Sequence, residues 1–378
     1  MVLKIILFAN TEWYLFNFRR SLALALREAG HEVLLVSPPG PYGERLRELG
    51  LQWIAAPMQR RSLNPLSEIR LVLWLQHLIR KERVDLVHGF TIKCAIYGSL
   101  AARIAGSRAR VNAVAGMGYV FTNDELRARL LRPVVRSLLR LALGGRNSRL
   151  ILQNPDDVTL FTRVGLVDAA RVRLIPGSGV DSSRFRQTSR SAASGNFRVL
   201  LAARMLWDKG IGEFVDAARI LQAQGRAVQF VLAGEPDPGN PASVPVATLN
   251  NWVADGSIEW LGHVEDMPAL LASVDVVVLP SYREGLPRTL IEAAACGLPL
   301  VTTDTPGCRE VVAHEVDGLL VPAKDAVVLS DAIARLQDDT RLAAMLGAAA
   351  RDKALSQFDE KIVIAKTMAV YRELLPDL

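Results

Sequence analysis

Two acidic residues separated by seven positions, Glu284 and Glu292, and two basic residues, Arg204 and Lys209, are the side chains best placed to do chemistry. Glu284 follows an apolar run, and Pro287 is suited to be the first residue of the helix that comes next. Free backbone N–H groups at a helix start bind anions, and carboxylates accept hydrogen bonds from sugar hydroxyls. The segment therefore indicates a site for a ligand with both hydroxyl groups and negative charge.

The basic pair supplies the positive charge that such a ligand requires. Arg204 and Lys209 follow a second apolar run, and Gly210 comes directly after them. Arginine offers a planar fork to phosphate oxygens, and lysine offers a compact point charge. Together they would neutralise a diphosphate leaving group without a metal, and the sequence contains neither a D-x-D pattern nor a cluster of Asp and His. We predict Glu284, Arg204 and Lys209 as catalytic residues, with no metal and no cofactor.

These segments resemble the signatures of glycosyltransferase family 4. Glu284-x7-Glu292, preceded by Pro-Ser and followed by Ala-Cys-Gly-x-Pro, is similar to its E-x7-E motif, and Arg204 with Lys209-Gly is similar to its diphosphate clamp. The likeness continues through residues 304–310 and 316–318. It implies the GT-B fold, a UDP-sugar donor and retention of anomeric configuration. It also implies that Glu292 binds the ribose, Glu284 the donor sugar and Arg204 with Lys209 the diphosphate, within a donor-binding set of Arg204, Lys209, Glu284, Gly285, Leu286, Pro287 and Glu292.

The first half resembles the branch of this family that assembles bacterial surface polysaccharides and glycans. The residues that carry this likeness are 10–19, Asn64-Pro65, 91–93, 97–102 and 116–118. The resemblance implies a polyprenyl-diphosphate-linked saccharide as acceptor, and an N-acetylhexosamine or a hexose as the sugar transferred. The candidate contacts for the acceptor or the sugar are His88, Lys93, Gly116, Gly118 and Asn10.

One position departs from the family pattern. Many members carry a histidine after the fifth strand, where this sequence has Ala115. His88, which the pattern places at the carboxyl end of strand Val84–Val87, is the nearest alternative, and a lone histidine there is about as often structural as functional. In the family's front-face mechanism the leaving diphosphate takes the acceptor proton, so no protein base is required.

The elements that must position these residues alternate regularly along the chain. Apolar, β-branched runs predict parallel strands buried on both faces, with helices between them. The predicted strands are Leu3–Phe8, Glu32–Val36, Gln52–Ala55, Val84–His88, Ala109–Val114, Arg149–Leu152, Val172–Ile175, Arg198–Ala203, Gln229–Ala233, Ile258–Leu261, Asp275–Leu279, Leu300–Thr303 and Gly318–Val321.

A Pro-Gly-Ser-Gly segment at 176–179, followed by a Ser- and Arg-rich stretch to Asn196, indicates a linker between two halves. We predict an α/β protein of two doubly wound, Rossmann-like domains that face each other across a cleft. Residues 1–178 would bind the acceptor and residues 179–357 the donor. The last helix, about 358–378, is expected to pack back on the first domain.

One segment has the pattern of an interfacial helix. Within 124–145, Arg132, Arg136 and Arg140 repeat at intervals of four and share a helical face beside an apolar stripe. Such a helix would lie on an anionic membrane, and a core-packed helix with an arginine rim is the alternative. Pro133 must either kink the segment or start a helix.

Composition agrees with a peripheral enzyme of the cytoplasm. Residues 1–180 contain 26 Lys+Arg against 13 Asp+Glu, whereas the remainder contains 19 against 26. An excess of +13 in the first half indicates an anionic partner, with a solvated arginine-rich surface as the alternative. A membrane fits better than nucleic acid, because no basic-aromatic platform is present. Three scattered cysteines suit a reducing compartment. We find no signal peptide and no membrane-spanning run, and predict a protein on the inner face of the cytoplasmic membrane.

Two other function classes stay open at this point. A UDP-sugar epimerase can share a two-lobed fold of the same type, although it would not need an Arg-rich apolar segment. A non-catalytic sugar-nucleotide-binding protein would need the donor residues but no acceptor site. An oxidoreductase is disfavoured, because no G-x-G-x-x-G follows the first strand.

Overall fold

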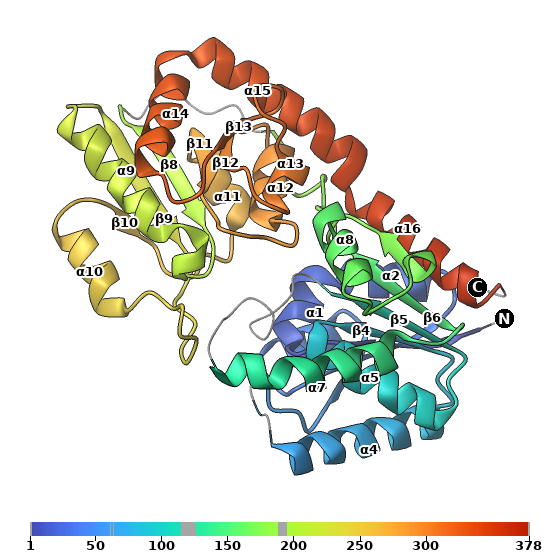
Figure 1. Cartoon of the computed structure of the whole chain (residues 1–378). Helices are drawn as coiled ribbons and strands as arrows, with labels where there is room; N and C mark the ends of the chain where they lie inside the picture. Colours follow the sequence, from blue (N-terminus) through green and yellow to red (C-terminus); the bar gives the residue numbers. More distant parts are fainter. Residues whose placement is uncertain (1, 61, 63, 115–125, 188–194, 377–378) are drawn as a thin grey trace. The chain divides into compact units, whose positions relative to one another are not determined.

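The computed structural model describes residues 2–60, 62, 64–114, 126–187 and 195–376 of the chain. It divides the chain into two compact units (Figure 1). The N-terminal unit contains Met1–Ser178 together with Lys361–Leu378, and the C-terminal unit contains Gly179–Glu360. Each unit has its own parallel sheet, so the chain has the predicted α/β class.

The N-terminal unit is built on a seven-stranded parallel sheet in the order β3-β2-β1-β4-β5-β6-β7. Its strands are β1 Lys4–Phe8, β2 Glu32–Ser37, β3 Gln52–Ala55, β4 Leu86–Phe90, β5 Ala109–Ala113, β6 Ser148–Leu152 and β7 Val172–Leu174. Its helices are α1 Glu12–Phe18, α2 Arg20–Glu28, α3 Tyr42–Glu48, α4 Pro65–Glu82, α5 Ile92–Ala105, α7 Leu126–Leu143, α8 Pro155–Arg163 and α16 Glu360–Leu374.

The C-terminal unit is built on a six-stranded parallel sheet in the order β10-β9-β8-β11-β12-β13. Its strands are β8 Phe197–Ala202, β9 Val228–Ala233, β10 Glu259–Trp260, β11 Val276–Leu279, β12 Leu300–Thr303 and β13 Leu319–Val321. Its helices are α9 Ile211–Ala223, α10 Val246–Ala254, α11 Met267–Ala272, α12 Arg288–Ala295, α13 Cys308–Val311, α14 Ala326–Asp338 and α15 Thr340–Lys353.

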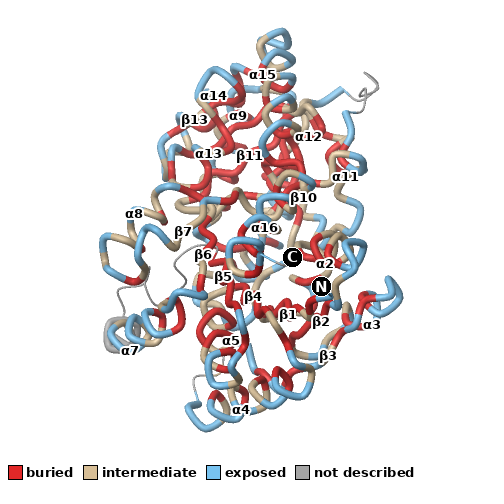
Figure 2. The backbone as a smooth tube through the Cα atoms, turned by 90° about the vertical axis from the view of Figure 1, so that its right-hand side faces the viewer, coloured by how far each residue is buried: buried red, intermediate tan, exposed pale blue. Residues whose placement is uncertain are grey.

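The strands form because both of their faces are covered. β1 and β11, for example, are buried over nearly their whole length, and Figure 2 shows the inner strands of both sheets as buried backbone. Such strands read as continuous apolar runs in the sequence, and this is why the predicted strands match the observed ones closely. β4 is the main difference, because it runs from Leu86 to Phe90 and so extends past His88.

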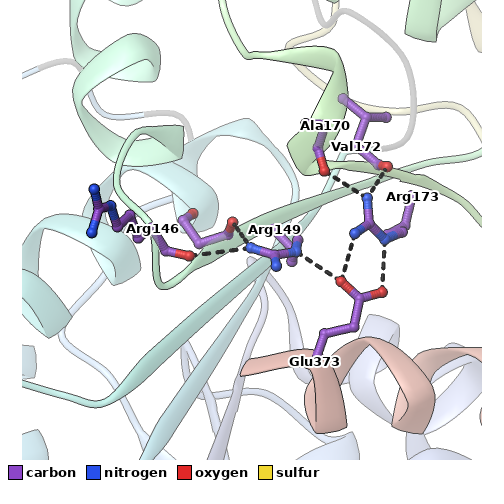
Figure 3. Close-up of polar contacts among 7 residues, drawn as sticks. Arg146, Arg149, Ala170, Val172, Arg173 and Glu373 are labelled. Atoms are coloured by element: carbon purple, nitrogen blue, oxygen red, sulfur yellow. Dashed lines mark hydrogen bonds and ion pairs between the residues drawn. The ribbon is translucent and has the colours of Figure 1, made fainter. Parts of the chain in front are cut away.

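The chain returns to the N-terminal unit through α16, whose apolar side chains complete a core of that unit. Val363, Val370 and Tyr371 are buried against residues of β1, β2 and β4. Glu373 ties the same helix to the sheet, because its carboxylate accepts hydrogen bonds from Arg149 Nε of β6 at 2.9 Å and Arg173 Nη2 of β7 at 2.6 Å (Figure 3). The last helix is therefore an integral part of this unit.

The Glu373 cluster makes the stability of this unit depend on pH. Hydrogen bonds from Arg173, and then from Arg149, hold the pKa of Glu373 below its ordinary value. A carboxyl with a depressed folded-state pKa stabilises the fold above its unfolded pKa, and that contribution is lost as pH falls through the folded value. We expect Glu373→Gln to lower the free energy of unfolding by about 1 kcal/mol at neutral pH, because the cluster is partly solvent-screened.

Urea unfolding at a series of pH values measures the difference in the free energy of unfolding between the wild type and Glu373→Gln. This difference should shrink as the pH falls, because protonation of Glu373 removes the same charge in the wild type. Glu28→Gln, at an exposed glutamate with no ion pair among the described residues, should leave the unfolding midpoint unchanged. A Glu373 difference that stays constant with pH would show that its charge is not the stabilising feature.

Candidate functional site

The predicted donor residues lie at one edge of the second sheet, because β8 and β11 are parallel neighbours. Arg204 and Lys209 lie in the segment that joins β8 to α9, and Glu284 lies in the segment that joins β11 to α12. The carboxyl ends of neighbouring parallel strands meet at the same edge, where α/β proteins bind ligands. The topology therefore brings these two loops together, as the sequence predicted.

Backbone contacts lock the two loops to each other. Tyr282 N donates to the carbonyl of Asp208 at 2.9 Å, and the buried Ser281 Oγ donates to the same carbonyl at 3.0 Å. Gly210 has a φ of +72°, and a Cβ there would lie 2.2 Å from the carbonyl oxygen of Pro280. Only glycine meets both requirements, so the Lys-Gly pair in the sequence reflects this close approach.

Lys209 and Glu284 form an ion pair across these loops. Lys209 Nζ donates to Glu284 Oε1, and the two side chains are only 18% and 12% exposed. Glu284 is supported from behind by the turn after β12: its backbone N–H donates to Pro306 O at 3.0 Å, and a Cβ on Gly307 would lie 2.5 Å from the carbonyl oxygen of Glu284. The Thr-Pro-Gly segment thus positions this acid.

Arg204 does not contact Glu284 in this structure but pairs with a residue that the sequence did not single out. Its Nη1 lies 2.8 Å from Asp237 Oδ2, in the segment after β9, while the Arg204 side chain remains 54% exposed. Asp237 also accepts a hydrogen bond from Asn240 Nδ2 at 3.2 Å. No sequence signal marked Asp237, because it is a single acid in a polar loop.

Glu292 lies on α12 and is almost completely buried. Arg288, one turn earlier on the same helix, places its Nε 2.7 Å from Glu292 Oε1. Burial raises the pKa of Glu292, and the charges of Arg288 and then Arg184 oppose that rise. Burial, and then the charge of Glu292, raise the pKa of the nearby Cys296 thiol. Pro287 was predicted to be the first residue of the helix. It is instead the N-cap, and α12 begins one residue later, at Arg288. Gly285 and Leu286 complete the loop, and Leu286 packs on the core.

A further polar contact steadies the same loop. Tyr282 donates its hydroxyl proton to Glu213 Oε1 of α9 at 2.6 Å, and Lys324 Nζ lies 4.9 Å from the centre of the Tyr282 ring. Sequence reasoning missed these contacts, because Tyr282 and Glu213 lie 69 positions apart in the chain and Lys324 belongs to a third segment. Tyr282 therefore links three segments that meet at this edge of the sheet.

His88 requires a correction. It was predicted at the carboxyl end of its strand, but it lies inside β4 and is 1% exposed. Its Nδ1 shares a hydrogen bond of 2.6 Å with Tyr371 Oη, and its ring lies against Phe90. Burial holds the pKa of His88 well below its ordinary value, so the ring is neutral. Tyr371 comes from α16, and a contact so distant in sequence could not be foreseen.

Lys93 also has a structural role. Its Nζ donates to Glu68 Oε1 at 2.7 Å and to the carbonyls of Gln59 at 2.7 Å and Ser62 at 3.1 Å. An ammonium has three N–H donors: two of them hold the segment before α4, and the third pairs with Glu68 of α4 itself. Asn10 follows β1 at the carboxyl edge of the first sheet, and its role as an acceptor contact stays a prediction. Gly116 and Gly118 lie outside the described residues.

The three arginines predicted to bind a membrane lie on α7, which runs through Pro133. Two of them cap another helix: Arg140 Nε donates to the carbonyl of Gly165 at 2.7 Å, and Arg136 Nη2 donates to the carbonyl of Val164, both at the end of α8. Cations commonly satisfy the last carbonyls of a helix. The membrane role of Arg132, Arg136 and Arg140 stays a prediction, and two of these guanidinium groups already have structural partners.

Within the described ranges, no group of three or more His, Cys, Asp or Glu side chains has the geometry to hold a metal ion. Among the helices whose residues are described, none combines the length and the apolar composition needed to cross a bilayer.

Comparison with known proteins finds a glycosyltransferase match for each unit. Residues 196–339 match the family model for glycosyl transferases group 1, and residues 17–177 match that for a glycosyl transferase 4-like domain. An N,N'-diacetylbacillosaminyl-diphospho-undecaprenol alpha-1,3-N-acetylgalactosaminyltransferase of Campylobacter jejuni is 30% identical over 96% of this chain and 97% of its own length. A UDP-Gal:alpha-D-GlcNAc-diphosphoundecaprenol alpha-1,3-galactosyltransferase of Escherichia coli is 26% identical over 81% of this chain and 80% of its own length.

Solved structures support the fold. Anabaena HepE in complex with UDP-glucose superimposes with a TM-score of 0.78 at 22% identity, covering 97% of this chain and 99% of its own. Sucrose-phosphate synthase from Thermosynechococcus elongatus gives a TM-score of 0.82 at 21% identity over the full length of both chains. The two-unit α/β architecture is thus the GT-B fold predicted from the motifs.

The Arg288–Glu292 pair predicts a measurable charge effect. Glu292 has a higher pKa in the folded protein than in the unfolded chain, where it is ordinarily 4.5. Such an acid lowers the free energy of unfolding as the pH rises from the unfolded-state pKa to the folded-state pKa. Removing the charge of Arg288 should raise the pKa of Glu292 further. The loss of stability in Arg288→Gln should then be larger and extend to higher pH than in the wild type.

NMR titration of protein labelled with ¹³C at the glutamate carboxyls, with Glu292→Gln to assign the resonance, reads this pKa directly. Arg335→Gln, which breaks an exposed ion pair with Glu315 in the same unit, serves as the charge-matched control and should not shift the Glu292 resonance. An unchanged Glu292 pKa in Arg288→Gln would refute the assignment of Arg288 as its counterion.

Proposed function

The chain belongs to the group 1 glycosyltransferases, and from that we propose that it transfers a sugar from a UDP-sugar to a polyprenyl-diphosphate-linked saccharide. The observation that carries this proposal is the meeting of Lys209 and Glu284 at the carboxyl edge of β8 and β11. A cation for a phosphate and an acid for sugar hydroxyls lie side by side there, as a sugar diphosphate requires.

The donor is proposed to replace protein carboxylates as the counterion of the two cations. Without a ligand, Lys209 is neutralised by Glu284, and Arg204 by Asp237. A diphosphate brings more negative charge than either acid and accepts several charge-assisted hydrogen bonds. Its binding would release Glu284 to accept hydrogen bonds from the donor sugar, while Glu292 accepts those of the ribose. Gly285, Leu286 and Pro287 would line the same loop.

Catalysis follows from charge development on the leaving group. As the bond between the anomeric carbon and the UDP oxygen breaks, negative charge grows on the diphosphate, and Arg204 and Lys209 stabilise it. The acceptor hydroxyl then bonds to the same carbon, and its proton passes to the leaving phosphate. We propose that this step retains configuration and needs no metal. The names of both curated relatives specify alpha linkages, which support retention if the donor sugar is alpha-linked to UDP.

The acceptor is proposed from the same relatives. Both are named for undecaprenyl-diphosphate-linked saccharides, and they transfer N-acetylgalactosamine and galactose. An N-acetylhexosamine or a hexose is therefore the proposed donor sugar here. The basic N-terminal half would meet the acceptor, with Asn10, Gly116 and Gly118 as candidate contacts. A lipid-linked acceptor also requires the enzyme to work at the cytoplasmic face of an anionic membrane, to which Arg132, Arg136 and Arg140 are proposed to contribute.

The test is a transfer assay with purified full-length protein in excess EDTA. A panel of UDP-sugars is incubated with a polyprenyl-diphosphate-saccharide, UDP release is measured, and the product is identified by mass and by the NMR coupling of the new anomeric proton. We expect UDP release only when both substrates are present, and a product heavier by one sugar with the donor's anomeric configuration.

Each other outcome contradicts a named part of the proposal. A changed sugar without transfer would indicate an epimerase, and binding without turnover would indicate a non-catalytic protein. Activity that EDTA abolishes and magnesium or manganese restores would refute metal independence. An inverted product would refute retention alone.

A further inference from the structure

Helix α4 of the N-terminal unit has an exposed face that carries apolar and basic side chains but no acid. At about 100° per residue, this face consists of Leu66, Ile69, Arg70, Leu73, His77, Arg80 and Lys81, all of them exposed. The two acids of the helix, Glu68 and Glu82, fall on the opposite side and form ion pairs with Lys93 and Lys4. We call these seven residues the α4 face.

Three large apolar side chains dominate the first half of the α4 face. Leu66, Ile69 and Leu73 are 75%, 57% and 55% exposed, although they lie at helical spacing and form one stripe. These three side chains do not contribute to the packing of the helix on its own unit. The opposite side of α4 packs on the core through buried residues that include Leu71, Leu75 and Ile79. A contiguous exposed apolar stripe is characteristic of a surface that meets another body.

The charges of the α4 face favour an anionic bilayer as the partner of this surface. Arg70 and Lys81 have no ion-pair partner among the described residues, and Arg80 donates to the carbonyl of Ile104 at 2.8 Å. Basic groups beside an apolar stripe, with no acid among them, match lipid phosphates over acyl chains. A protein partner of ordinary composition would require acids and hydrogen-bond acceptors facing each base, whereas a lipid surface supplies negative charge everywhere.

The neighbouring helices extend this surface. α5 packs between α4 and α7 within the N-terminal unit (Figure 1). Ile104, at the end of α5 beside Arg80, is 52% exposed, and Leu141 of α7 is 47% exposed. By contrast, Arg136 and Arg140 are directed to the end of α8. Among the residues whose side chains are described, the available apolar and basic groups therefore centre on α4, and the described part of α7 lies at the margin of the surface.

We propose that the α4 face docks on an anionic membrane, with Leu66, Ile69 and Leu73 in the interfacial layer and Arg70 and Lys81 at the lipid phosphates. The proposal deepens the proposed function, on which its choice of a lipid partner rests, because an enzyme for a lipid-linked acceptor must reach the bilayer. It differs from the α7 prediction, because it places the contact on another helix and leaves α7 at the margin of the surface.

Co-sedimentation of the full-length protein with vesicles tests the proposal. The vesicles contain either phosphatidylcholine alone or an equimolar mixture with phosphatidylglycerol. We expect the wild type to bind the mixed vesicles, and more weakly as salt rises. Replacing Leu66, Ile69 and Leu73 together by Ser should weaken that binding by at least about tenfold, since each side chain loses contact with the interfacial layer. Arg70→Glu with Lys81→Glu should weaken it by a similar factor at low salt.

Matched controls separate docking from general surface change. Val246→Ser with Val253→Ser removes two exposed apolar side chains from one helix of the C-terminal unit, 50% and 43% exposed, and should leave binding unchanged. Arg146→Glu reverses an exposed charge of the N-terminal unit and should have a much smaller effect. All substituted side chains are exposed, so each variant should keep the wild-type circular dichroism and unfolding midpoint.

Activity distinguishes this proposal from the proposed function. The α4 variants should retain transfer to a short, water-soluble acceptor analogue and lose transfer to acceptor embedded in mixed vesicles. No transfer by the wild type to either acceptor would refute the proposed function while leaving the binding result valid. Wild-type protein that ignores the vesicles, or α4 variants that bind them as well as the wild type, would overturn the docking proposal. A changed oligomeric state in the α4 variants, without changed lipid binding, would overturn it too, in favour of a protein interface.

Discussion

The ion pair between Lys209 and Glu284 depends on two parallel strands that are neighbours in space, although 75 residues separate the pair in sequence. β8 and β11 end at the same edge, and their loops approach so closely that Gly210 cannot carry a side chain. The turn at Gly307 then fixes Glu284 from the other side. Gly210 and Gly307 thus support this one contact from both sides.

The charged and titratable side chains have different surroundings in the two units. In the C-terminal unit, acids and bases lie paired at the sheet edge, where a ligand can exchange with a partner of the same charge. In the N-terminal unit, His88 is buried and neutral against Tyr371, and Lys93 is fully hydrogen-bonded. This distribution of charges suits the proposed donor site in the C-terminal unit and a solvent-exposed basic surface on the N-terminal unit.

The sequence was sufficient to predict the sheets and the meeting of the loops that carry Lys209 and Glu284, because buried parallel strands and positive-φ glycines leave local signals. It was insufficient where the partner comes from a distant segment that carries no recognisable pattern. Arg204 meets Asp237, and His88 meets Tyr371 of the last helix. Neither contact has a local pattern. The spacing of the arginines on α7 suggested a membrane face, but spacing alone cannot reveal that two of them cap α8, or that α4 leaves an apolar stripe exposed.

The central claim is that Lys209 exchanges Glu284 for a donor diphosphate. Isothermal titration calorimetry with UDP tests it most directly, with Arg226→Ala, which breaks the exposed ion pair to Asp338, as control. The account predicts that Lys209→Ala binds UDP at least about tenfold more weakly, because a charge-assisted contact is lost and Glu284 is left unpaired. It also predicts that adding Glu284→Gln recovers part of the affinity. UDP binding by Lys209→Ala that equals the wild type and the control would contradict it.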